Sequence, residues 1–100
     1  MKNKVEKLIA ELSDITELKE AVSSATELIE FGEYKIAIEN LTENIIEDNY
    51  IISHQHYKML EDILSVYNDE YDKQLLRLIT KTSYSNKETG KSNRTSINRR

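Results

Sequence analysis

The sequence predicts an all-α protein, a compact bundle of four or five short helices followed by a polar, basic C-terminal tail. Its 100 residues include no proline and only two glycines, so few residues break helices. Apolar residues recur every three or four positions through most of the chain, and no alternating pattern is long enough to indicate a sheet. We therefore expect one helical domain at residues 1–82 and a tail at residues 83–100.

The first two helices are expected between residues 4 and 30. Asn3 and Glu6 have the spacing of a capping box at the start of the first helix. Ser13 and Asp14 precede the second apolar stripe as candidate N-caps, which predicts a break near residue 13. Because the two stripes nearly merge, one long, bent helix is the alternative.

Three further helices follow a glycine. Gly32 is placed where a helix C-terminus favours a left-handed residue, and a third helix is expected at about 33–47. Ser53 is expected to cap a fourth helix, and Asn68 and Asp69 to cap a fifth. The stripe of the fifth helix expected to face the core is Tyr71, Leu75, Leu78 and Ile79.

Charge is unevenly distributed along the chain. Residues 1–80 carry 17 acidic and 8 basic side chains, whereas residues 81–100 carry one acidic and six basic side chains. The sequence lacks an apolar run long enough to span a membrane, and its N-terminus lacks an apolar signal segment. We therefore expect a cytoplasmic protein with no membrane contact.

The sequence shows no motif for catalysis or for holding a cofactor. It contains no cysteine, no glycine-rich phosphate loop and no nucleophile motif around a serine. His54 and His56 are two positions apart on a predicted helix, so their side chains diverge and cannot chelate one metal ion. We expect no enzyme activity, no cofactor and no metal site.

An acidic stripe is the most distinctive feature of the third predicted helix. Glu39, Glu43 and Glu47 follow at intervals of four and share one face, although like charges at this spacing destabilise a helix. Asp48 adds negative charge at the helix C-terminus, where the dipole disfavours it. A solvated face that maintains solubility is one interpretation, and a surface complementary to a basic partner is the other. The residues expected to contact such a partner are Glu39, Glu43, Glu47, Asp48, Tyr50, Glu61, Asp62, Asp69 and Glu70.

The segment from about residue 20 to residue 67 resembles small bacterial immunity proteins. The resemblance rests on the run from Glu30 to Tyr34, on Ala37, Glu39 and Leu41, and on Ser53 with the Tyr57, Leu60 and Leu64 stripe. The pattern is similar to the MafI-like group and to the immunity proteins (CdiI-like) of contact-dependent growth inhibition systems.

This resemblance implies a small helical inhibitor without catalytic residues. Its expected partner is the C-terminal domain of a cognate polymorphic toxin, a basic nuclease such as a tRNase, other RNase or DNase, and a host factor is a possible third member of the complex. Occlusion of the substrate surface would neutralise the toxin. Two alternatives stay open: a nucleic-acid-associated regulator that uses the basic tail, and a helical adaptor subunit. Because the domain is acidic, direct nucleic-acid binding is not expected.

Overall fold

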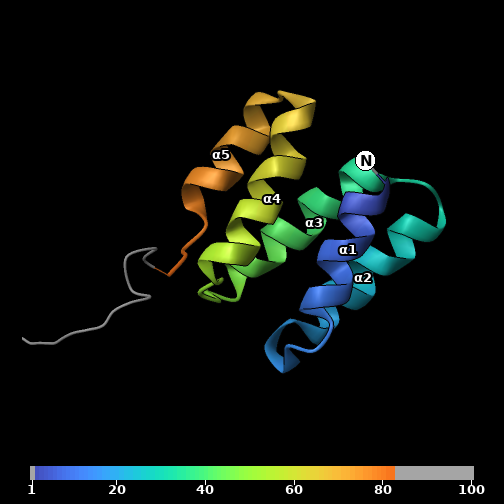
Figure 1. Cartoon of the computed structure of the whole chain (residues 1–100), viewed down its shortest axis with the longest axis horizontal. Coiled ribbons are helices and arrows are strands. Elements are labelled where there is room, and N and C mark those ends of the chain that lie inside the picture. Colours follow the sequence, from blue (N-terminus) through green and yellow to red (C-terminus); the bar gives the residue numbers. More distant parts are fainter. Residues whose placement is uncertain (1, 83–100) are drawn as a thin grey trace, which may run out of the picture.

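The computed structural model describes residues 2–82, and it confirms the all-α fold class (Figure 1). The α-helices are α1 (Lys2–Leu12), α2 (Lys19–Glu30), α3 (Tyr34–Glu47), α4 (His54–Tyr67) and α5 (Glu70–Leu78), with a 3-10 turn at Thr16–Leu18 before α2. Within this described part, no helix has the length and apolar character needed to cross a membrane. The predicted basic tail, residues 83–100, lies outside the described residues.

Helix α3 occupies the centre of the bundle. It packs most extensively against α2 and also contacts α1, α4 and α5. Figure 1 shows α4 and α5 side by side on one side of α3 and α2 on the other, and α1 contacts both α2 and α4. A helix with neighbours on several sides buries more than one face, so Ala37, Ile38, Leu41 and Ile45 are all fully buried. Acidic residues near the middle of α3, such as Glu39 and Glu43, therefore lie close to neighbouring helices.

A single apolar core joins the helices. Its largest fully buried side chains come from α1, α3, α4 and the adjoining segments, and they are Val5, Leu8, Leu12, Leu18, Ile38, Leu41, Ile45, Ile52, Leu60, Ile63 and Leu64. Tyr34, Tyr57 and Tyr67 are partly buried against this core. Such partial burial suits tyrosine, because the ring packs against apolar neighbours while the hydroxyl reaches the surface.

Three predicted helix boundaries are confirmed. Gly32 adopts a φ of 77° between α2 and α3, a left-handed conformation that glycine tolerates best. The Ser53 hydroxyl accepts a hydrogen bond from the His56 backbone N–H at 3.1 Å and caps α4. The Asp69 carboxylate accepts from the Tyr71 backbone N–H at 2.8 Å and caps α5.

Other predicted caps are wrong, although the expected break near residue 13 occurs. Helix α1 already includes Lys2, so Asn3 lies inside its first turn. Neither Ser13 nor Asp14 caps α2, because the Ser13 hydroxyl donates to the Ala10 carbonyl at 2.7 Å and so bonds to the end of α1. Asn68 adopts a left-handed conformation that terminates α4 rather than capping α5.

The predicted core face of α5 is partly wrong. Leu75 and Ile79 are buried as expected, but Tyr71 and Leu78 are exposed and Asp72 is buried in their place. The segment after Leu78 is extended, and the Ile52 backbone pairs with it through hydrogen bonds to Thr80 and Thr82 of 3.0 and 2.9 Å. This pairing fixes the end of α5 and turns the stripe through Asp72, Leu75 and Ile79 inward.

Candidate functional site

The nine acidic and aromatic residues predicted to contact a partner fall into three groups. Glu61 and Asp62 lie on α4, and Asp62 faces α1. Glu39 and Glu43 lie on α3 opposite the start of α5, which carries Asp69 and Glu70. The third group, at the end of α3, comprises Glu47, Asp48 and Tyr50. The α4 pair therefore lies on a different helix from the other seven residues, which lie on α3, on the segment that follows it and at the start of α5.

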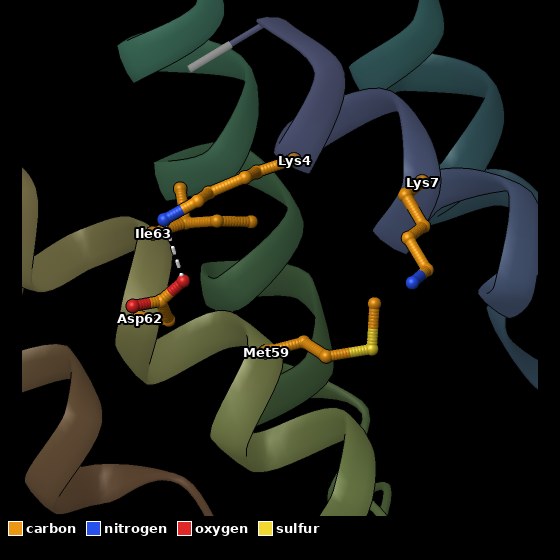
Figure 2. A pocket seen from close by; sticks show the side chains of 5 residues that line it. All are labelled: Lys4, Lys7, Met59, Asp62 and Ile63. Atoms are coloured by element: carbon orange, nitrogen blue, oxygen red, sulfur yellow. Dashed lines mark ion pairs between the residues drawn. The ribbon is translucent and has the colours of Figure 1, made fainter.

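The two carboxylates on α4 have lysine partners within the chain. Lys58 pairs with Glu61 at 2.7 Å, and Lys4 of α1 pairs with Asp62 at 2.8 Å. Asp62 also lines a pocket of about 240 Å³ between α1 and α4, together with Lys4, Lys7, Met59 and Ile63 (Figure 2). Two lysines at this pocket offset the negative charge, so this side of the bundle is not a strongly acidic surface.

Lys35 connects α3 to the start of α5. Its ammonium donates to Glu39 Oε2 at 2.7 Å and to Asp69 Oδ2 at 3.0 Å. The bond to Glu39, and then the bond to Asp69, raise the pKa of Lys35 above its usual range. The pKa of Asp69 is lowered, first by this bond from Lys35 and then by the Tyr71 backbone N–H. Lys35 therefore keeps its charge, and two of the predicted contact residues are engaged within the fold.

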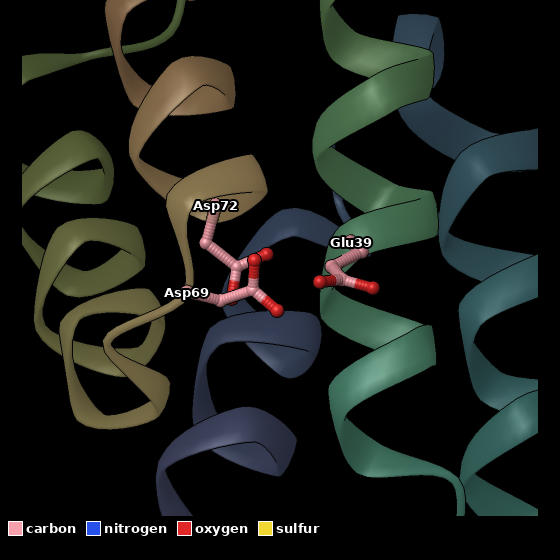
Figure 3. Close-up of side chains that lie close together, drawn as sticks. All are labelled: Glu39, Asp69 and Asp72. Carbon is pink, nitrogen blue, oxygen red and sulfur yellow. The ribbon is translucent and has the colours of Figure 1, made fainter.

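Asp72 is the unusual residue beside this ion pair. Its side chain is only 1% exposed, and neither of its carboxylate oxygens has a hydrogen-bond partner among the described residues. Carboxylate oxygens of Glu39, Asp69 and Asp72 lie within 4.8 Å of one another, and Figure 3 shows the three side chains converging from α3 and α5. Burial, followed by the contact with Glu39, raises the pKa of Asp72 from its ordinary value of 3.8 to about 7.

Sequence reasoning missed Asp72, although a signal was present. Asp72, Leu75 and Ile79 have the i, i+3, i+7 spacing of one helix face, and the last two were predicted to be buried. Because Asp72 is charged, the stripe through Tyr71 was predicted to be the buried face of α5. Buried carboxylates are paired, protonated or bound to a cation, so this position requires one of these solutions.

Glu43 has a neutral partner. The Tyr71 hydroxyl donates a hydrogen bond to Glu43 Oε2, which raises the pKa of Tyr71 to about 12. At sequence level Glu43 had no basic residue three or four positions away, and the structure supplies a donor from α5 instead. Two of the three glutamates in the predicted stripe are therefore hydrogen-bonded within the fold.

The end of α3 carries carboxylates of a different kind. Glu47 and Asp48 are exposed, and among residues 2–82 no ion pair involves either one. Tyr50 packs partly against the core, whereas Ile51 beside it is 56% exposed. We call Glu47, Asp48, Tyr50 and Ile51 the α3 edge. It combines uncompensated negative charge with accessible apolar surface.

A second exposed patch, which sequence reasoning missed, surrounds the turn between α2 and α3. Phe31 is 80% exposed and stands between two exposed glutamates, Glu30 and Glu33. Neither glutamate forms an ion pair with another described residue. The position of Phe31 immediately before the predicted helix-terminating Gly32 was the available signal, because a residue at such a turn has few neighbours. A large exposed aromatic side chain is a common anchor at protein interfaces.

The two histidines lie in the first turn of α4. His56 Nε2 is 3.1 Å from Glu11 Oε1, which links α4 to the end of α1. The His54 backbone N–H donates to the Thr82 hydroxyl at 3.0 Å. The contacts described for this turn thus join α4 to the end of α1 and to the extended segment after α5.

Comparisons with protein-family models, with curated proteins and with solved structures give no match to this chain.

Proposed function

We propose that this protein is an immunity protein, which binds a basic bacterial toxin domain and neutralises it by covering the surface that holds the substrate. The observation that carries this proposal is the α3 edge. Negative charge at a helix C-terminus opposes the helix dipole, and Glu47 and Asp48 have no compensating ion pair among residues 2–82. A cationic partner would remove this repulsion, so binding gains free energy at that position.

The charge of the domain supports the same kind of partner. Residues 2–82 contain 17 acidic and 9 basic side chains. A nuclease surface that binds phosphates is basic, and an acidic protein approaches it faster through electrostatic steering. The exposed Ile51, three residues after Asp48, adds apolar surface to the acidic residues of the α3 edge. Inhibition in this proposal is steric and requires no chemistry from the inhibitor.

The test begins with the full-length chain carrying an affinity tag, expressed from its own locus together with the adjacent upstream reading frame. We expect a basic C-terminal fragment of a large secreted protein to co-purify one-to-one at moderate salt. Co-expression with that fragment should also restore the growth that the fragment alone arrests. Capture of nucleic acid alone, or of an unrelated host protein, would contradict the proposal.

A charge-reversal pair locates the contact. Glu47→Lys with Asp48→Lys should weaken toxin binding by roughly tenfold to a hundredfold, because close interfacial charge pairs contribute several kcal/mol. The substitutions should not unfold the protein, since lysine at a helix C-terminus is favoured by the dipole. Glu6→Lys with Glu27→Lys is the matched control, because it changes the net charge equally at exposed positions of α1 and α2 outside their first turns. Equal loss in both variants would indicate that net charge, and not the α3 edge, determines binding.

Phe31 distinguishes the helical adaptor from the immunity protein. Its exposed ring favours docking through an apolar contact. Phe31→Ala is compared with the Glu47→Lys and Asp48→Lys double variant for binding of a host protein other than a toxin. If only Phe31→Ala abolishes that binding, the adaptor function replaces the one proposed here.

A further inference from the structure

We propose that Glu39, Asp69 and Asp72 form a binding site for a hard divalent cation, and that Ca²⁺ is the occupant that fits best. This site lies between α3 and α5, whereas the α3 edge lies at the end of α3. The proposal does not depend on the toxin partner, and either one can fail without the other.

The spacing of the three carboxylates suits the larger of the common hard cations. Their nearest oxygens lie within 4.8 Å of one another. Ca²⁺ binds oxygen at about 2.3–2.6 Å, so two ligands on opposite sides of the ion stand roughly 4.6–5.2 Å apart. Mg²⁺ binds at about 2.0–2.1 Å in a strict octahedron and usually keeps several waters, so it is less suited than Ca²⁺ to a site built mainly from protein carboxylates. One Asp69 oxygen accepts from the Tyr71 backbone N–H, which leaves as many as five carboxylate oxygens for an ion, and Ca²⁺ accepts both one-oxygen and two-oxygen coordination.

Asp72 provides evidence that is independent of the clustering. Clusters of exposed acidic residues are common and need no ligand, but this side chain is 1% exposed and directed toward the other two carboxylates (Figure 3). Neither of its oxygens has a hydrogen-bond partner among residues 2–82. A buried carboxylate without a donor is costly, and a coordinated cation would satisfy both oxygens.

Lys35 supplies part of the charge that the cluster needs. One ammonium faces three carboxylates, and it bonds to Glu39 and Asp69 but not to Asp72. The Lys35 side chain is 39% exposed and has a flexible stem, so its ammonium has a path to solvent when a divalent ion enters. Lys35 therefore competes with the ion. Its removal should tighten Ca²⁺ binding, because the competing ammonium is then absent.

The experiment titrates CaCl₂ and, separately, MgCl₂ into the full-length, chelator-treated protein at constant ionic strength, with calorimetry and thermal unfolding as readouts. We expect a single saturable Ca²⁺ site, a higher midpoint of unfolding with Ca²⁺, and weaker Mg²⁺ binding. Asp72→Asn should weaken Ca²⁺ binding at least tenfold, and Lys35→Met should strengthen it several-fold. Glu20→Gln, which neutralises an exposed acid on α2, should leave the affinity unchanged.

Two results would overturn the proposal. One is the absence of saturable Ca²⁺ binding to the wild-type protein. The other is binding that Asp72→Asn leaves unchanged, which would place the ion elsewhere on the acidic surface. If the circular dichroism of Asp72→Asn shows a loss of helix, Glu39→Gln replaces it, and unchanged binding in that variant overturns the proposal equally.

Discussion

Replacing Asp72 by asparagine should stabilise the metal-free protein, and the gain should grow as the pH rises. Asparagine has nearly the shape of a protonated aspartic acid, and its amide can donate to Glu39 without a buried charge. In the folded protein the pKa of Asp72 is about 7, compared with an ordinary value of 3.8. The folded state thus binds a proton more tightly than the unfolded state. This group's contribution to stability is therefore fully present below about pH 4 and is lost as the pH rises to about 7.

The size of the effect follows from the same pKa values. Each tenfold change in proton affinity corresponds to about 1.4 kcal/mol, so the shift from 3.8 to about 7 sets a ceiling of about 4 kcal/mol on the loss. Structural relaxation around a charged Asp72 reduces this cost, and we expect roughly 2 kcal/mol at pH 8. At pH 5 the difference between Asp72→Asn and wild type should be roughly 40% of that value, because the loss begins near pH 4, where the carboxyl of the unfolded chain ionises.

Other charged groups surround Asp72 and also titrate, so the comparison must be between variants. Lys35 and Glu39 face it from α3, and Asp69 lies at the N-cap of α5. The lowered pKa of Asp69 acts in the opposite direction, since its stabilisation is present above pH 4 and is lost below it. Subtracting the wild-type free energy of unfolding from that of Asp72→Asn at each pH removes the contributions of the groups that both proteins contain.

The assay is unfolding by urea in the presence of EDTA, monitored by circular dichroism at several pH values between 5 and 8. With a slope of about 1–2 kcal/mol per molar urea, a gain of 2 kcal/mol moves the midpoint by about 1–2 M. Glu20→Gln is the control, because it removes the same charge at an exposed position and its difference from wild type should be small. An Asp72→Asn protein that gains no stability between pH 5 and pH 8 would refute the assignment of Asp72 as a buried group with a raised pKa.

Three further substitutions test the packing and the helix boundaries by the same unfolding assay. Leu60→Ala should cost about 2–5 kcal/mol, because the side chain is fully buried and its removal leaves a cavity. Ser53→Ala should cost about 1 kcal/mol through loss of the hydrogen bond that caps α4, and Ser53→Asp, which can also cap, should not. Gly32→Ala should cost about 1 kcal/mol through its φ of 77° alone, since no atom lies within 4 Å of the added methyl group. A variant as stable as wild type would contradict the structural role given to that residue.

The fold was largely predictable because helix boundaries depend on local chemistry. Ser53, Asp69 and Gly32 act through backbone groups within three or four positions, and short-range rules describe them well. The same rules failed where two local partners compete. Ser13 was expected to begin the second helix, but its hydroxyl is close enough to the Ala10 carbonyl to bond with the first.

The candidate site was less predictable because it depends on which face of α5 turns inward. Two stripes pass through Leu75, one with Tyr71 and one with Asp72, and local apolarity favours the first. Which stripe is buried depends on contacts outside the helix. Ile52 pairs with the extended segment after α5 and so restricts the rotation of α5 about its axis. Contacts between residues almost thirty positions apart leave no periodic signal in a sequence.

Position along α3 gives the three glutamates of the predicted stripe different roles, although their spacing in the sequence is identical. Glu39 meets Lys35 and the carboxylates at the start of α5, and Glu43 meets the Tyr71 hydroxyl. Glu47 lies beyond these contacts and stays exposed. Neutralising Glu39 should therefore change stability and cation binding, whereas neutralising Glu47 should change the affinity for a basic partner. In the proposed immunity function, the stripe binds its partner through the part that the tertiary structure leaves without an ion pair or hydrogen bond, which among residues 2–82 is the end of α3.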